Sequence, residues 1–395
     1  MRLQLIGAVV TASMIAAPAV AEPTKSGSPI TSDATLGTGY YTDTDHVTVL
    51  TPTVAATVQN PTAGWSASAS YLVDVVSAAS VDIVSTASGR WNEVRQAGTA
   101  SGSYAPKDVG VHAAVGISSE PDYLSLSGAA RLTWDFAEKS HRLTVGYGRT
   151  HDTIGRHGTP FSVFSRTLDV DLLTASLAFT LNSSTALSLG SDFYYEHGDQ
   201  SKPYRYIPMF SAAVAPTIEN GASVDEVNQK RLGARPLEQL PLNRTRYALT
   251  ARFGHRFDHG TLRVDERFYT DSWALHASTT EARYYLDLSR RFTVWPRFRF
   301  HAQDSVYFWR RAYVGVYGPG GWELPTLRTG DRELGPLTTV GGGLGGTWNF
   351  GGAMRPKSWQ LSAAADWMHT AYIDDLYVTS RDAFLATLGV EGVWE

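Results

Sequence analysis

Arginine and carboxylate side chains recur at alternate positions in four stretches of the second half of the chain. The stretch 293–309, for example, places Arg297 and Arg299 on one face and Phe298 on the other. Because successive side chains of a strand point to opposite faces, each stretch has a charged side and an apolar side. The pattern selects as lumen and selectivity candidates Arg246, Arg252, Arg263, Arg267, Arg283, Arg297, Arg299, Asp265 and Asp271.

Two interpretations of these charges stay open. A basic inner surface would attract an anionic solute or polymer. Alternatively, interspersed carboxylates such as Glu281 and Asp287 pair with the arginines and stiffen a wall. Glu266 and Asp304 fall on the apolar side, so we expect them near a rim or at a slip of the register.

Other patterns predict no catalytic, cofactor or metal site. Asp43-Thr44-Asp45 and Asp374-Asp375 would suit Ca²⁺, but acidic pairs at strand ends are usually turn residues. Glycines between 341 and 346 lack the Lys-Ser/Thr of a phosphate loop, so they predict close backbone packing or a bend in the barrel. The histidines lack metal-ligand spacing, and no spacing selects a Ser–His–carboxylate set. We therefore predict that the protein is not an enzyme and keep a hydrolase at the rim as an alternative.

Positioning these side chains requires strands along the whole chain. Segments of about ten residues alternate apolar and polar side chains, which is typical of a transmembrane antiparallel up-and-down β-barrel. We predict about sixteen strands, with fourteen to eighteen allowed because the first and fourth are the weakest. Their ranges are 35–42, 46–58, 65–75, 93–104, 109–119, 123–136, 141–152, 167–181, 185–198, 244–257, 261–274, 280–290, 293–309, 337–350, 359–373 and 382–394.

The connections predict the orientation of the barrel. Short turns, such as Asn182-Ser183-Ser184, alternate with long connections, and long connections of such barrels are extracellular. The predicted extracellular loops are 76–92, 153–166, 199–243 and 310–336. The loop 199–243 is too long for a plain connection. It is either a plug or partner-binding cap, or an ordinary surface loop.

The beginning of the chain predicts export. Arg2 precedes an apolar stretch that ends at Ala19-Val20-Ala21, an A-x-A cleavage site. We expect a signal peptide at 1–21, a periplasmic lead-in at 22–34 and a barrel at 35–395. The formal net charge of −4 argues against a nucleic-acid partner. The absence of Cys excludes thiolate metal sites and covalent haem attachment through paired cysteines.

Five short strings occur in a consistent order along the chain: DVVSAAS at 74–80, EPDY at 120–123, LPLNRTR at 240–246, YTDSW at 269–273 and PRFRF at 296–300. Together they resemble an uncharacterised family of bacterial outer-membrane proteins, the domain of unknown function 3570. The resemblance covers roughly residues 39 to 395 and implies a Gram-negative outer-membrane barrel. It brings no substrate or catalytic residue with it. In its general architecture, the family also resembles larger barrels that surround multihaem cytochromes.

These observations predict an outer-membrane channel or import/export conduit with an Arg-rich lumen. The alternative function is structural: a sheath or docking barrel for a periplasmic or extracellular protein. That partner could be a redox protein that brings its own cofactor. The expected partners are outer-membrane lipid and the barrel-insertion machinery, since Phe384 to Trp394 form an apolar-alternating last strand with a closing aromatic. The one departure is Glu395, which follows that aromatic.

Overall fold

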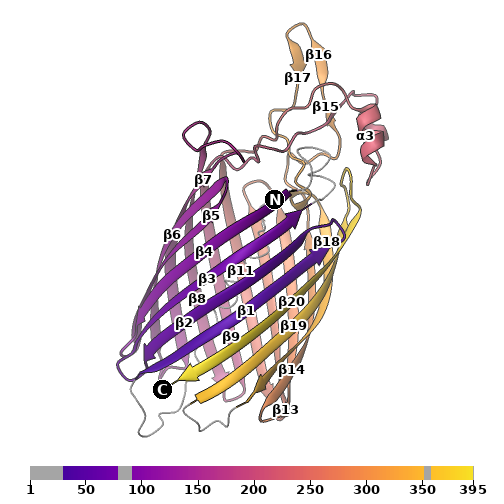
Figure 1. The fold of residues 1–395 in the computed structure, drawn as a ribbon. Helices are drawn as coiled ribbons and strands as arrows, with labels where there is room; N and C mark the ends of the chain where they lie inside the picture. Colours follow the sequence, from indigo (N-terminus) through magenta and orange to yellow (C-terminus); the bar gives the residue numbers. More distant parts are fainter. Residues whose placement is uncertain (1–29, 79–90, 351–356, 395) are drawn as a thin grey trace.

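The computed structural model describes residues 30–78, 91–350 and 357–394, and its strands close into one antiparallel barrel (Figure 1). Each barrel strand pairs with its neighbours in chain order, and β1 pairs with β20 to close the sheet. The barrel strands are β1 (Thr31–Asp43), β2 (Thr48–Asn60), β3 (Trp65–Ala78), β4 (Trp91–Tyr104), β5 (Val109–Glu120), β6 (Tyr123–Phe136), β7 (His141–Ile154), β8 (Arg166–Asn182), β9 (Thr185–Gly198), β11 (Asn243–Phe257), β12 (Gly260–Asp271), β13 (His276–Ser289), β14 (Phe292–Gln303), β18 (Leu337–Asn349), β19 (Lys357–Tyr372) and β20 (Ser380–Trp394). The prediction of an all-β transmembrane barrel with sixteen strands is confirmed.

Short elements occupy the long connections. They are β10 (Met209–Phe210), η1 (Ala215–Thr217), α3 (Val224–Lys230), β15 (Tyr313–Val314), β16 (Val316–Gly318), β17 (Gly321–Glu323) and η2 (Arg332–Leu334). Among the described residues, no helix has the length and apolar character needed to cross a membrane.

Alternation along each strand separates an outward from an inward face. On β11, Tyr247, Leu249 and Phe253 are exposed side chains of one face, as expected for contact with lipid. The arginines of β11 occupy the other face and contact side chains of neighbouring strands. A shift of pairing by one residue would turn these arginines toward lipid, so the pattern fixes the register.

Several strand ends differ from the prediction. Strand β14 ends at Gln303 rather than 309, and β12 ends at Asp271 rather than 274. Asp304 therefore belongs to a loop, where its Oδ1 accepts a hydrogen bond from the backbone N of His276 at 2.6 Å. Strand β1 begins at Thr31, inside the range predicted as a periplasmic lead-in. The predicted signal peptide at 1–21 lies outside the described residues, as does most of the predicted loop 76–92.

The connections 199–242 and 304–336 fold together into a structure that we call the cap. In Figure 1 its helix α3 and its hairpin β16–β17 stand above one side of the rim, whereas only short connections rise above β5 and β6. Strands β10 and β15 pair in parallel, which joins the two connections. Three clusters of buried apolar side chains form its core, including Ile207, Phe210 and Trp309. The long loop is thus an ordered cap with its own core.

One segment of the cap, 331–335, reaches into the mouth of the barrel, and we call it the mouth strap. Arg332 lies 2.5 Å from a carboxylate oxygen of Asp45 in the connection from β1 to β2. Glu333 accepts hydrogen bonds from the Tyr372 hydroxyl of β19 and from Arg381 of β20, both at 3.2 Å. Gln303 of β14 donates to the backbone oxygens of Glu333 and Gly335. The strap is therefore tied to inward-facing residues of three strands.

Candidate functional site: the lumen wall and its mouth

The structure brings all nine predicted site residues onto one continuous wall, formed by β11, β12, β13 and β14. They occupy the face opposite the exposed aromatic rows, which include Tyr247, Phe268 and Phe298. Since these strands are adjacent in the sheet, the candidates lie in register across it. We call this surface the arginine wall.

Every arginine of this wall has a carboxylate partner, and two carboxylates have two arginines each. Asp265 contacts Arg252 at 2.9 Å and Arg263 at 3.0 Å, and Glu281 contacts both Arg283 and Arg299. The other pairs are Arg244–Asp271, Arg246–Glu196, Arg256–Asp287, Arg267–Asp192 and Arg297–Asp366. Nine arginines thus share seven carboxylates, which leaves an excess of two positive charges on this wall.

The opposite wall carries hydroxyl groups, a feature that the sequence analysis did not identify. Halfway round the closed sheet from β11–β14 lie β2–β5. Cross-strand bonds join Ser66 to Ser103 at 2.7 Å, Ser70 to Thr99 at 2.6 Å and Ser68 to Thr57 at 3.2 Å. The alternating Ser-Ala-Ser-Ala-Ser run at 66–70 is the signal that could have revealed it. The lumen wall therefore has an arginine-rich side and a side rich in hydroxyl groups.

Glycines of β18 make room for the arginine wall. A Cβ at Gly343 would overlap the carboxylate of Asp366, and one at Gly345 would overlap the indole of Trp295. Asp366 accepts a hydrogen bond from Arg297 Nε at 2.8 Å, directly across this bare backbone. Close packing is thus found at Gly343 and Gly345, where no larger residue fits without movement of its neighbours.

The mouth strap and the cap meet at a cluster of ionised groups outside the membrane. Asp331 contacts Lys202 at 2.7 Å and Arg205 at 2.9 Å. Burial alone would raise the pKa of Asp331, but the two cations outweigh it and hold this pKa well below its usual value. Burial raises the pKa of Asp45, although Arg332 opposes the shift. The strap is thus held by charges that are largely removed from water.

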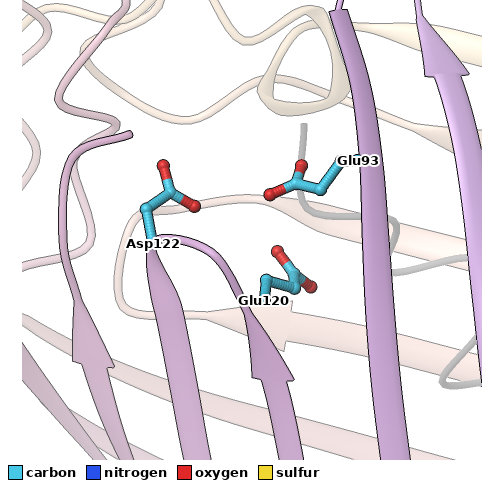
Figure 2. A group of neighbouring side chains, drawn as sticks. All are labelled: Glu93, Glu120 and Asp122. Atoms are coloured by element: carbon cyan, nitrogen blue, oxygen red, sulfur yellow. The ribbon is translucent and has the colours of Figure 1, made fainter. Parts of the chain in front are cut away.

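A second group of acidic side chains lies at the same rim, at the ends of β4 and β5. Glu93, Glu120 and Asp122 point toward one another from β4, β5 and the turn after β5 (Figure 2). Their ligand oxygens lie within 4.8 Å of one another, an arrangement that suits a hard cation such as Ca²⁺. Asp122 also accepts a hydrogen bond from the Tyr204 hydroxyl of the cap. Burial and this bond raise the pKa of Tyr204. The sequence analysis did not identify this group, because its members come from separate strands.

The acidic pairs at strand ends, for which the sequence favours turn residues over Ca²⁺ ligands, contact backbone groups and arginines. Asp43 accepts bonds from the backbone N of Asp45 and of Val47, which is the contact of a turn residue. Asp374 pairs with Arg311, and Asp375 accepts backbone bonds from Tyr377 and Val378.

Histidines contact hydroxyls or carboxylates in separate places. Ser140 lies 2.7 Å from His141 at a short turn on the rim opposite the cap. His151 and His369 each lie 3.0 Å from an aspartate, on the outward face.

A closed barrel of sixteen antiparallel strands, with an apolar outer face and a charged inner wall, defines an outer-membrane β-barrel protein. The chain belongs to the family described as "Protein of unknown function (DUF3570)", whose family profile matches residues 165–371. The matched region contains the arginine wall and both connections of the cap. No curated protein matches this chain.

Three bacterial proteins are among the solved structures with a similar course of the chain. The outer-membrane protein OpdK from Pseudomonas aeruginosa has 6% sequence identity and a TM-score of 0.42, with 92% of this chain and 99% of that chain covered. OprD from the same organism has 8% identity and a TM-score of 0.41, with 92% and 94% covered. The siderophore receptor PirA from Acinetobacter baumannii has 10% identity and a TM-score of 0.41, with 88% and 54% covered. The chain thus spans about half the length of that receptor, and at these identities the likeness carries no information on a substrate.

Proposed function

We propose that the protein is a non-enzymatic outer-membrane channel that favours anionic solutes. The proposal rests on the unequal numbers of opposite charges on the arginine wall, where nine arginines pair with only seven carboxylates. An excess of positive charge along one side of a narrow aqueous path raises the local concentration of anions. Passage would be passive, with the hydroxyl wall offering neutral hydrogen-bonding partners.

Planar-bilayer recordings under a salt gradient test this proposal. Arg263→Gln combined with Arg299→Gln removes one arginine from each shared carboxylate, so the excess of positive charge disappears. We expect the reversal potential to move toward cation preference while the channel still conducts. The matched control is Arg149→Gln, because Arg149 lies on the outward face with Asp169 and Asp171. An unchanged reversal potential in the double variant would show that the wall charge does not set selectivity.

A second candidate function, docking of an extracellular protein, is favoured by the hairpin of the cap. Tyr317 and Trp322 are 73% and 40% exposed and contact each other edge to face at 5.2 Å. Exposed aromatic side chains on a protruding element are typical of binding surfaces. Under this alternative, Tyr317→Ser with Trp322→Ser abolishes recovery of a stoichiometric partner and leaves conductance unchanged. If the double variant recovers the same proteins as the native barrel, the docking function is wrong.

A further inference from the structure

One carboxyl group of the arginine-rich side faces lipid rather than the lumen. Glu266 pairs with Ala251 of β11 and Thr280 of β13 across the sheet. Its neighbour on the same face, Phe268, is 57% exposed, as is usual for a lipid-facing side chain. Glu266 is the seventh of the twelve residues of β12, so it lies near the middle of the hydrocarbon layer.

Two hydroxyl groups of the next strand hold this carboxyl. Ser278 donates to Oε1 at 2.7 Å, and Thr280 donates to Oε2 at 2.5 Å. A carboxylate offers about four acceptor positions, and a carboxylic acid has a proton to donate, so hydrogen-bonding capacity is left over in either form. A hydrocarbon tail can satisfy none of it, and acidic groups on the lipid face of a barrel are destabilising.

The side chains around Glu266 also have the sizes expected at an interface between two membrane proteins. The outward side chains of β13 from Ser278 to Ala282 are small and only partly exposed. The aromatic rings of Phe268 on β12 and of Phe298 and Phe300 on β14 flank them. Small residues between larger ones let two membrane proteins approach closely. We call this outward surface of β11–β14 the Glu266 face.

We propose that the Glu266 face is the interface of a dimer, and that its occupant is a second copy of this chain, related by a two-fold axis along the membrane normal. Such a contact places each Glu266 opposite the same surface at the same depth, where the protonated carboxyl of one copy donates a hydrogen bond to a carboxyl or hydroxyl oxygen of the other. The four strands span about 19 Å, and the apolar band is about 25 Å tall. A pair of such faces buries on the order of 1,000 Å², which reaches the lower bound for a specific interface.

Disulfide cross-linking in the membrane tests the dimer, because the chain contains no Cys. Ala282→Cys puts a single thiol on the Glu266 face and leaves the bonds of Glu266 intact. The matched control is Val115→Cys, since Val115 is 64% exposed and is likewise the seventh residue of a twelve-residue strand, β5. Full-length protein in outer-membrane vesicles is oxidised and separated on a non-reducing gel.

The expected result is a disulfide-linked pair for Ala282→Cys and monomer for Val115→Cys. Adding Glu266→Leu to Ala282→Cys should remove most of the linked pair, while heat-modifiability on a gel shows that the barrel still folds. Monomer in both single variants would show that lipid covers the face and would overturn the proposal. Equal linkage in both would indicate random collision and would overturn it as well.

Discussion

At the scale of single residues, the barrel combines deeply buried ion pairs on its inner wall with exposed ones in its short connections, and the two kinds should differ in their contribution to stability. Asp74 on β3 is 1% exposed. It accepts a hydrogen bond from Thr51 at 2.6 Å and one from Arg95 Nε at 2.7 Å. By contrast, Asp108 and Lys139 are 4.0 Å apart, with side chains 62% and 67% exposed.

Replacing Asp74 should therefore destabilise the barrel far more than replacing Asp108. Asp74→Ala leaves Arg95 without its carboxylate in a poorly hydrated place, which costs about 3–5 kcal/mol. The control Asp108→Ala should change the free energy of unfolding by roughly 0–1 kcal/mol. Urea unfolding in lipid vesicles measures both. Similar losses in the two variants would show that burial does not strengthen the Asp74 contact.

The charge cluster at the mouth strap should resist acid. Because the pKa of Asp331 is held well below that of a free aspartate, its contribution to stability is fully present above about pH 3.9, the pKa of the unfolded chain. This contribution is lost as the pH falls through the lower pKa of the folded protein.

Hydrogen exchange checks this prediction, once corrected for intrinsic rates. Between pH 7 and about pH 4, Asp331 should contribute no loss of protection to residues 331–335, and protection should decline only at lower pH. In Asp331→Asn this dependence should be absent, although protection is weaker throughout. A decline centred near pH 6 in the native protein would show that another group controls the strap.

At the scale of elements, alternation along the sequence was enough to predict the barrel strands. The ranges 123–136 and 185–198 agree with β6 and β9 at both ends, because a turn residue stops the alternation where the chain reverses. The prediction for β14 ran past Gln303 because Val306 and Phe308 continue the apolar alternation. These two side chains are buried in a cluster of the cap instead of facing lipid. Periodicity shows that a side chain is buried or faces lipid, but it does not distinguish the two.

The candidate site was predictable in part, for the same reason. Alternation assigned the charged residues to one face, yet their partners on distant strands, such as Asp366 for Arg297, depend on the order in which the sheet closes. The pairing of β10 with β15 joins residues about a hundred positions apart, in parallel, and no local pattern encodes it.

The glycines of β18 give a test of how the wall is packed. Gly343→Ala places a methyl group where Asp366 lies, so Arg297 and Asp366 must move into the lumen. We expect a loss of about 1–3 kcal/mol and a lower single-channel conductance. The neighbouring variant Gly342→Ala is the control, because its added Cβ meets only a backbone oxygen at 3.8 Å. Equal conductance in the two variants would contradict the packing role of Gly343.

At the scale of the whole molecule, the cap and the barrel are joined through the strap, so the strap should limit the opening. Arg332 is 5% exposed and contacts Asp45, and its guanidinium lies over the Tyr372 ring at 5.1 Å. Replacing Arg332 therefore removes two contacts of the strap, one with Asp45 and one with the Tyr372 ring.

Arg332→Ala should therefore raise single-channel conductance and weaken exchange protection of the strap. The control is Arg328→Ala, because Arg328 donates to backbone oxygens of the cap, at Leu237, Pro325 and Thr326. An Arg332 variant with native conductance would show that the strap does not narrow the path.

The seam between β1 and β20 sets the order of events during biogenesis. Twelve residues of β1, from Ser32 to Asp43, have their second set of partners in Ala383–Trp394, more than three hundred positions later. Until that strand arrives, the growing sheet has two open edges, each a template for pairing with a wrong chain. Closure therefore requires the last strand of the chain, and the entropy cost of closing so large a loop makes it slow. A nascent chain of this kind needs an external template for its free edges, and any stall before residue 383 leaves an unsealed and aggregation-prone sheet.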